Sequence, residues 1–444
     1  MIKEEDILYD EQDEEQDISV QRNIRADAAD AQVDSLHKRY TKQKLVVHPP
    51  YQRNFVWDAK KASLLIESVL MNIPVPMIYL AANADGKTNV IDGQQRLISL
   101  FSFIDGKFPD GSVFKLTGLK VLTKLKGLTY ADLDETDQDK INEYTLRTVT
   151  FTADSDPELQ YEIFSRLNTG SVALNNQELR NCVYRGSFND LIKKLASEKD
   201  FLTLIGLNAP HKRMQDVELV LRFASFYFNG YQNYKAPIRQ FLNETIRKRI
   251  NLDELDKSNL EKAFKKAVAN IQTLLGSNAF KRYYKGDDKN KNGRWESSKF
   301  NVSLYDVLMD SMARIDQTVL TRNRDAIFEA YVDLLSSNQE FIDSIELSTS
   351  SKQAVEKRFV KWNYVLNGVI GNDKPDTRCF SRAFKKSLYD VNPTCAICGQ
   401  HIVELDDSAV DHIEQYWLGG KTIPENARLT HRYCNWSRPR KENK

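Results

Sequence analysis

Residues 395–435 read CAICGQHIVELDDSAVDHIEQYWLGGKTIPENARLTHRYCN, and here residue types and spacing together specify a chemistry. Cys395 and Cys398 have the Cys-x-x-Cys spacing of a zinc knuckle, and His431 and Cys434 repeat that spacing further along the chain. Three thiolates and one imidazole complete a closed tetrahedral site of the structural kind. Because the segment between the two pairs is too short for a hydrophobic core of its own, we expect Zn²⁺ to supply folding free energy here.

The same stretch contains four further residues in a recognisable order, namely Asp411, His412, Asn426 and Asn435. In this order it resembles the HNH endonucleases, the ββα-metal nucleases. The resemblance implies that His412 is the general base that activates water against a phosphodiester, a role that the unperturbed pKa of histidine, near neutrality, suits. It also implies that Asp411 and Asn435 hold a catalytic divalent cation, Mg²⁺ or Mn²⁺, and that Asn426 orients His412.

Two residues of this stretch have a second interpretation. Asn435 stands where the family name has a histidine, and an amide oxygen suits hard Mg²⁺ at least as well. His431 is alternatively the last histidine of the nuclease motif, which would leave three zinc ligands and make His401 the next candidate for the fourth. The whole stretch could also be a zinc ribbon that only binds, but Asp411-His412 and Gly419-Gly420 at nuclease spacing favour a nuclease.

Bulk composition indicates a globular protein of two or three domains. The chain has 444 residues, of which 41% are hydrophobic, and no apolar run approaches the length of a membrane span. The first residues, MIKEEDILYDEQDEEQD, do not show the basic and then apolar pattern of a secretory signal. The five cysteines fit a reducing compartment. We therefore predict a cytoplasmic protein without membrane contact. A net charge of +1 means that any affinity for nucleic acid comes from local patches.

The first 34 residues are strongly acidic and poor in aromatic residues, which predicts a disordered or loosely docked arm. Such an arm either covers a basic groove as a mimic of nucleic acid or only solvates the chain.

The sequence pattern of residues 35–150 is typical of a compact α+β domain. MIYLAANADGKTNVIDGQQRLISLFSFIDG predicts a hairpin through Asp85-Gly86, a strand ending at Ile91, a glycine turn and a helix from about Gln95. This layout places residues 92–96 at a helix N-terminus, where backbone N–H groups and Arg96 can hold a phosphate.

VIDGQQRLISL, with HPPYQRNFVW upstream and IFSRLNTGSVALNNQELRN downstream, resembles the domain family marked by a DGQQR motif. That family occurs in GmrSD-type modification-dependent restriction systems and related phage-defence proteins, and is distantly similar to ParB and sulfiredoxin folds. The resemblance implies binding or hydrolysis of a nucleoside triphosphate. The candidate nucleotide contacts that it implies are Asp92, Gly93, Gln94, Gln95, Arg96, Tyr51, Gln52, Arg53, Asn168 and Glu178.

The residues of the DGQQR motif also allow a purely structural interpretation. Asp92-Gly93 is an ordinary turn dipeptide, Arg96 has Asp92 and Glu67 as possible ion-pair partners, and a single glycine is no phosphate-cradling loop.

Residues 151–371 show apolar spacing typical of a helical bundle, interrupted by KRYYKGDDKNKNGRWESSKF. In this loop basic residues alternate with Tyr283, Tyr284 and Trp295. The pattern fits phosphate contacts with base stacking, and it equally fits a solvated loop whose aromatic side chains pack back on the bundle. Residues 372–444 then form the nuclease domain, with Arg428, Arg432, Arg438 and Arg440 expected near flanking phosphates.

The sequence therefore predicts an α+β protein with a ParB-like N-terminal domain, a helical middle region and a small zinc-stabilised HNH domain. The predicted function is a restriction or phage-defence DNA endonuclease, controlled by an N-terminal domain that senses a nucleotide or a DNA modification. Its predicted partners are double-stranded DNA, modified or of phage origin, a nucleotide and a second copy of the chain. The rival functions are a nucleoside triphosphatase and a DNA-binding regulator whose zinc domain does not cut.

Overall fold

The computed structural model describes residues 26–47, 57–82, 86–152, 161–162, 165–166, 175–371, 379–416 and 419–438. The described residues up to Asn189, with Lys212–Gln215, form one compact unit, and Asp190–His211 with the residues from Asp216 onward form the other. The mixed α+β class is confirmed, whereas the ParB likeness and the domain borders stay predictions. Among the described residues, no helix combines the length and apolar character needed to cross a lipid bilayer.

A mixed sheet forms the centre of the N-terminal unit, and its described strands run in the order β1-β5-β3-β4-β2. These strands are β1 (Ala26–Gln32), β2 (Leu45–Val46), β3 (Ile78–Ala82), β4 (Thr88–Asp92) and β5 (Thr145–Phe151). The predicted hairpin is the antiparallel pair of β3 and β4, while β3 runs parallel to β5. The core of this unit lies between the sheet and the helices α1 (Val33–Thr41), α2 (Ala59–Leu70), α3 (Gln94–Ile104) and α4 (Glu135–Glu143).

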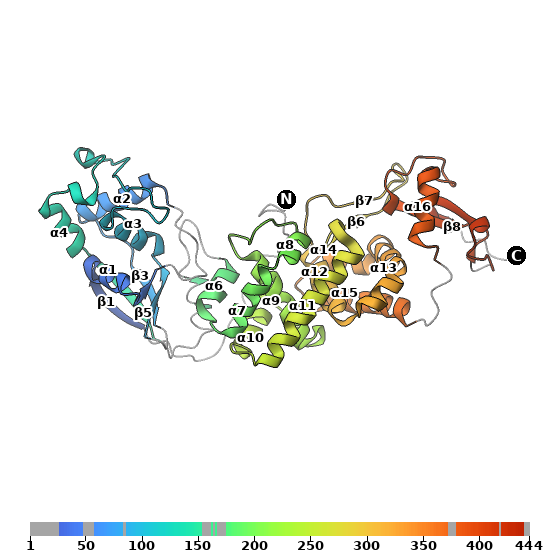
Figure 1. Ribbon diagram of the computed structural model, residues 1–444, viewed down its shortest axis with the longest axis horizontal. Coiled ribbons are helices and arrows are strands. Elements are labelled where there is room, and N and C mark those ends of the chain that lie inside the picture. The colour runs from blue at the N-terminus through green and yellow to red at the C-terminus, as the bar shows by residue number, and fades with distance from the viewer. Residues whose placement is uncertain are drawn as a thin grey trace. The chain divides into compact units, whose positions relative to one another are not determined.

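The predicted acidic arm is too long at its C-terminal end. Residues 26–32 form β1, which pairs with β5 along its whole length, and Val33 begins a helix (Figure 1). The strand was not predicted because alanine is the only apolar residue type in ADAADAQ, so the sequence shows no pattern of a buried face. Its pairing with β5 through backbone hydrogen bonds identifies it as a strand. Residues 1–25 of the arm lie outside the described residues.

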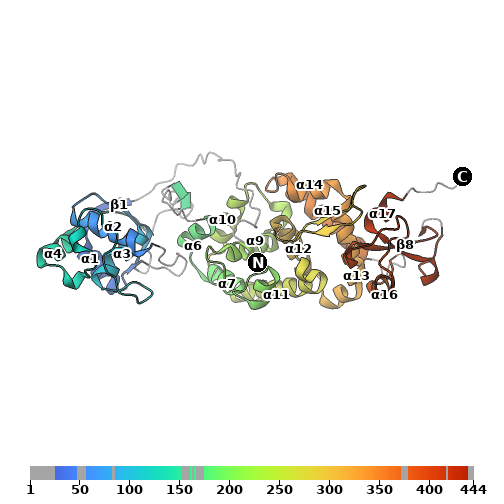
Figure 2. The ribbon, with the colours of Figure 1, turned by 90° about the horizontal axis from the view of Figure 1, so that it is seen from above.

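The second unit is mainly helical, as predicted for the middle of the chain. Its helices pack around long apolar faces, with α11 and α12 side by side and α13 against α15 (Figure 2). A buried ion pair joins two of its helices, because Nε and Nη2 of Arg222 donate to Oδ1 and Oδ2 of Asp306, at 2.9 and 2.6 Å. The helices from the end of the N-terminal unit onward are α6 (Asn176–Val183), α7 (Ser187–Ala196), α8 (Lys199–Leu204), α9 (Gln215–Asn229), α10 (Ile238–Lys248), α11 (Glu254–Leu275), α12 (Val302–Arg314), α13 (Gln317–Ser337), α14 (Gln339–Glu346) and α15 (Lys352–Ile370).

The C-terminal part of this unit is a small ββα arrangement that follows α16 (Arg382–Val391). It consists of β8 (Ser408–His412), β9 (Ala427–His431) and α17 (Arg432–Ser437), with β8 and β9 antiparallel. Apart from two cysteines, its buried apolar core holds only Ile402 and Leu429 among the described residues. So little buried apolar surface cannot stabilise the arrangement alone.

Candidate nuclease and zinc site

The ββα arrangement brings the predicted nuclease residues into one region. Asp411 and His412 are the last two residues of β8, and they pair with Arg428 and Ala427 at the start of β9. Asn426 directly precedes β9, and Asn435 is half-buried in α17. Asp411 and His412 thus lie beside the start of β9, and Asn426 immediately precedes their partner residues on that strand.

His412 is held in place by its neighbours. Its Nε2 lies 2.9 Å from Thr422 Oγ1, and its ring lies 4.8 Å from that of Phe380 and 5.6 Å from that of Tyr416, measured between centroids. The residue is 8% exposed. Packing and a hydrogen bond thus fix the orientation of the His412 ring. Sequence reasoning missed Thr422, because no spacing rule connects it to His412.

Asp411 accepts hydrogen bonds from two arginines. Arg428 donates from Nε and Nη2 to Oδ2, at 2.8 and 2.7 Å. Arg438 Nη1 donates to Oδ1 at 3.0 Å and to Oδ2 at 2.8 Å, and also to the carbonyl oxygen of His412 at 2.8 Å. Among the described residues, Oδ1 receives this one hydrogen bond, so it keeps acceptor capacity for a hard cation. By their chemistry, the carboxylate of Asp411 and the side-chain amide of Asn435 are oxygen ligands of the kind that Mg²⁺ and Mn²⁺ prefer.

Asn426 shapes the loop that follows His412. Its Oδ1 accepts the backbone N–H of Glu414 at 2.7 Å, and its Nδ2 donates to the carbonyl oxygens of Glu414 and Lys421, at 3.1 and 2.9 Å. The predicted role, orienting His412, would therefore act through the backbone of this loop.

Gly420 lets the same loop close. A Cβ atom on Gly420 would lie 1.9 Å from the carbonyl oxygen of Glu414 and 3.0 Å from Nδ2 of Asn426. We expect Gly420→Ala to displace the loop from Asn426 and to reduce DNA cleavage by about 10²-fold, because small misplacements of catalytic groups have effects of that size. Initial rates of plasmid nicking measure this.

The matched control is Gly368→Ala in α15, where an added Cβ meets nothing within 4 Å. It should leave the nicking rate unchanged. Equal rates for the Gly420 and Gly368 variants would show that the loop geometry does not matter for cleavage.

Cys395, Cys398, His431 and Cys434 form a compact group whose ligand atoms all lie within 4.8 Å of one another. His431 Nδ1 faces the sulfur atoms, at 3.4 Å from Cys398 Sγ and 3.9 Å from Cys434 Sγ. Its Nε2 lies 3.3 Å from the carbonyl oxygen of His401, the kind of outer contact that fixes a ligating imidazole. His401 thus contributes its backbone to the group, and its exposed ring is not among the four ligands.

The thiols of this group have perturbed acidities. Burial raises the pKa of Cys395, but backbone N–H groups of Cys398, His431 and Ile397 outweigh this effect and lower the pKa to about 7. Burial and the neighbouring cysteines raise the pKa of Cys434. Sulfur atoms this close cannot all ionise without a cation among them, so the donor set fits Zn²⁺.

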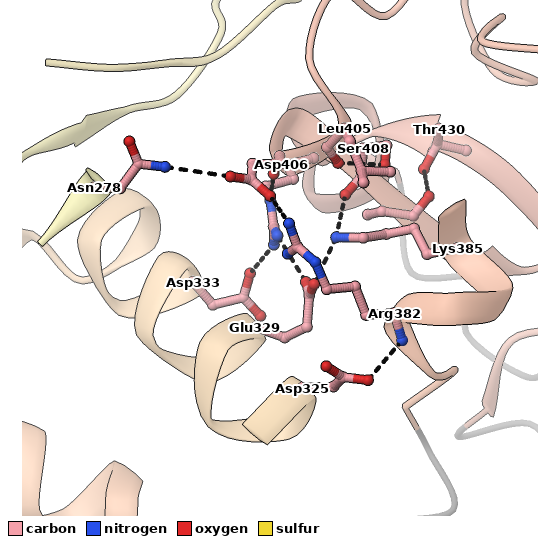
Figure 3. A network of polar contacts seen from close by, with 12 residues as sticks. Asn278, Asp325, Glu329, Asp333, Arg382, Lys385, Leu405, Asp406, Ser408 and Thr430 are labelled. Carbon is pink, nitrogen blue, oxygen red and sulfur yellow. Dashed lines mark hydrogen bonds and ion pairs between the residues drawn. The ribbon is translucent and has the colours of Figure 1, made fainter. Parts of the chain in front are cut away.

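A network of polar contacts joins the ββα arrangement to α13 (Figure 3). Arg432, at the start of α17, is 2% exposed and lies 2.7 Å from Oε2 of Glu329. Burial raises the pKa of Glu329, but the Arg432 and Lys385 cations outweigh it and hold the pKa below its ordinary value. Arg432 therefore does not reach flanking phosphates as predicted, because its charge is already paired inside the protein. Arg440 lies outside the described residues.

The basic loop between β6 (Tyr283–Tyr284) and β7 (Arg294–Trp295) also packs against the ββα arrangement. The Tyr283 hydroxyl donates to Asp407 at 2.6 Å, and Trp295 Nε1 donates to Asp406 at 3.3 Å. Tyr283 is fully buried and therefore cannot be a platform for nucleic-acid bases, while half-buried Trp295 is anchored to the protein through its indole N–H.

The DGQQR motif lies at the end of β4 and the start of α3, as predicted. Gly93 has a φ of 97°, and a Cβ there would lie 2.3 Å from Ile78 Cδ1, so only glycine fits this turn. Arg96 donates to Asp92 at 2.5 Å and to the carbonyl oxygen of Pro76 at 2.6 Å, which supports the structural interpretation of this pair. Gln94 is buried.

The other predicted nucleotide contacts are partly described. The side-chain oxygen of Gln95 accepts the backbone N–H of Trp57 at 3.3 Å. Glu178 is 1% exposed, caps its own helix by accepting from the backbone N–H of Asn175, and pairs with Arg213 at 3.1 Å. Tyr51, Gln52, Arg53 and Asn168 lie outside the described residues.

Comparison with known proteins gives two matches, one towards each end of the chain. Residues 33–185 match the family model of the GmrSD restriction endonuclease N-terminal domain, and residues 395–439 match that of the HNH endonuclease. No curated protein and no solved structure matches the chain. The order of the two matches is the one that the sequence motifs predict. The chain thus joins a domain of the GmrSD restriction endonuclease N-terminal type to a C-terminal HNH endonuclease domain.

Proposed function

We propose that this protein is a restriction or phage-defence endonuclease that hydrolyses phosphodiester bonds of double-stranded DNA at the end of β8. The observation that carries this proposal is the position of Asp411 and His412 at the end of one strand, opposite the start of β9 and close to α17. In that arrangement a base and a cation-binding carboxylate can act on one phosphate.

The proposed proton transfer depends on the hydrogen bond between His412 and Thr422. When Nε2–H donates to Thr422 Oγ1, the basic lone pair is on Nδ1, where it accepts a proton from water. The water oxygen then bonds to phosphorus while the bond from phosphorus to the leaving sugar oxygen breaks. Asp411 and Asn435 hold Mg²⁺ or Mn²⁺ in this proposal, and the cation, when bound, stabilises the developing charge on the phosphate and on the leaving oxygen.

Zn²⁺ in the group of three cysteines and His431 has a structural role in this proposal. All four protein ligands are supplied, so no position is open for water or substrate. His431 and Cys434 flank the start of α17, so the metal would hold the helix that carries Asn435.

The N-terminal domain is proposed to sense a nucleotide or a DNA modification and to license the nuclease. Its family match to a restriction endonuclease supports this assignment. A nucleoside triphosphate is the candidate signal, whether or not it is hydrolysed, and modified or phage DNA is the candidate target. One nuclease site per chain would cut both strands through two copies of the chain or through two successive nicks. We place this activity in the cytoplasm, where foreign DNA arrives.

The test is cleavage of supercoiled plasmid by the full chain. We expect nicking or cutting that requires Mg²⁺ or Mn²⁺, that stops with a chelator, and that differs between modified and unmodified DNA or with and without triphosphate. Each condition changes one component, so the measurement identifies the signal separately from the cleavage. If folded, zinc-loaded protein cleaved no DNA under any of these conditions, the proposal would be wrong.

A further inference from the structure

One face of α13 carries three acidic side chains spaced four residues apart, Asp325, Glu329 and Asp333. Residues at this spacing lie on the same side of a helix. All three contact residues of the C-terminal region (Figure 3). Asp325 accepts the backbone N–H of Arg382 at 2.8 Å, where α16 begins, and Asp333 lies 3.5 Å from Arg432.

Glu329 is the centre of this face because each of its oxygens binds a different cation. Lys385 Nζ lies 2.6 Å from Oε1, and Arg432 Nη2 lies 2.7 Å from Oε2. Both cationic side chains are almost fully buried, with exposed fractions of 3% and 2%. Without this carboxylate the two buried cations would repel each other, and the more distant Asp333 would be left as a partner of Arg432.

The same two cations hold the backbone that leads into β8. Lys385 Nζ donates to the carbonyl oxygen of Ser408 at 3.3 Å, and Arg432 Nε donates to that of Asp406 at 2.6 Å. Ser408 is the first residue of β8, and His412 is the last. Because β8 spans about 13 Å, a small tilt of the strand at Ser408 would displace the side chains of Asp411 and His412 at its other end.

A second set of contacts fixes the same backbone from the β6–β7 hairpin. The Tyr283 hydroxyl donates to Asp407, which is fully buried, and a Cβ on Gly293 would lie 2.6 Å from that carboxylate. Asp406 accepts from Asn278 of the helical region and from Arg382 of α16. The segment before β8 is thus held by side chains that belong to the helical part of the chain.

We propose that Glu329 is a positioning residue of the nuclease, through which α13 sets the place of the catalytic strand. The inference rests on the proposed function and extends it, because it identifies α13 as the element through which the helical region acts on cleavage. Glu329 touches neither DNA nor the reacting atoms. It acts through Lys385, Arg432 and the carbonyl groups that these cations hold.

The test compares Glu329→Gln with Glu340→Gln in the full chain. Glu340 is on α14 and pairs with Lys361 at 2.6 Å, in an exposed ion pair away from the nuclease contacts. We expect Glu329→Gln to lower kcat for plasmid nicking by about 10-fold or more with KM unchanged, since catalytic groups tolerate little misplacement. Zinc content should stay at the wild-type value, and Glu340→Gln should behave as wild type.

Two further measurements separate positioning from a merely structural role. Amide hydrogen exchange in β8 should accelerate in Glu329→Gln, and the conservative variant Glu329→Asp should recover part of the lost kcat. A kcat equal to wild type in Glu329→Gln overturns the inference, and so does a loss of kcat that only follows a loss of zinc. Wild-type protein that cuts no DNA would contradict the proposed function instead, while the exchange rates of β8 would still test the contact with α13.

Discussion

His412→Ala abolishes most of the DNA cleavage while the protein keeps its fold and its zinc. We expect the nicking rate to fall by about 10²- to 10⁴-fold, because a positioned general base contributes on that scale. The loss should appear in kcat rather than in DNA affinity, since the imidazole takes up a proton only as the bond to phosphorus forms. Single-turnover nicking of supercoiled plasmid with saturating Mg²⁺ or Mn²⁺ measures it.

His401→Ala is the matched control for this variant. His401 contacts His431 only with its backbone carbonyl, and its ring is exposed. The control should therefore keep both cleavage and zinc. If His412→Ala cleaved as fast as His401→Ala, the base would have to be another residue.

Cys395→Ser should release zinc and unfold the region around residues 395–434. Zinc binding contributes on the order of 10 kcal/mol to the folding of small zinc domains, and the buried apolar core of this region is too small to replace that contribution. Cys395 is also 1% exposed, and its sulfur accepts the backbone N–H of His431. Zinc content by elemental analysis and limited proteolysis of the C-terminal region report the two effects.

Cys379→Ser is the control, because Cys379 is exposed and lies outside the group of four ligands. It should keep the wild-type zinc content and the wild-type pattern of proteolysis. Unchanged zinc in Cys395→Ser would contradict the assignment of that ligand.

Local patterns were enough to predict the parts of the structure that depend on spacing. The repeated two-residue spacing brings Cys395, Cys398, His431 and Cys434 together, and the predicted nuclease motif lies within the residues that match the HNH endonuclease model. The turn at Gly93 followed by α3 was also predictable, because glycine after an apolar strand marks such a turn. These features depend on residues that are close in sequence or that have the spacing of ligands to a single metal ion.

Contacts between distant segments were not predictable in this way. Arg432 looked like a phosphate contact because its partner Glu329 is far away in sequence. For the same reason, the pattern of the β6–β7 hairpin fitted base stacking and packing against the bundle equally well, and the contacts of Tyr283 and Trp295 with Asp407 and Asp406 could not be predicted. The sequence shows that a charged or aromatic side chain requires an interaction partner. Which residue that partner is depends on how α13 and the β6–β7 hairpin pack against the ββα arrangement.

The two arginines on Asp411 have a thermodynamic consequence for DNA binding. Asp411 carries one negative charge, and Arg428 and Arg438 carry one positive charge each, so this cluster is positive before any divalent cation arrives. In the proposed site, a cation at Oδ1 would therefore be repelled by this cluster and attracted by a DNA phosphate. The phosphate would in turn be attracted by both arginines and by the cation. Linkage then requires that cation and DNA raise each other's affinity by the same factor. The protein alone would hold its catalytic cation weakly, and the DNA substrate would complete the cation site.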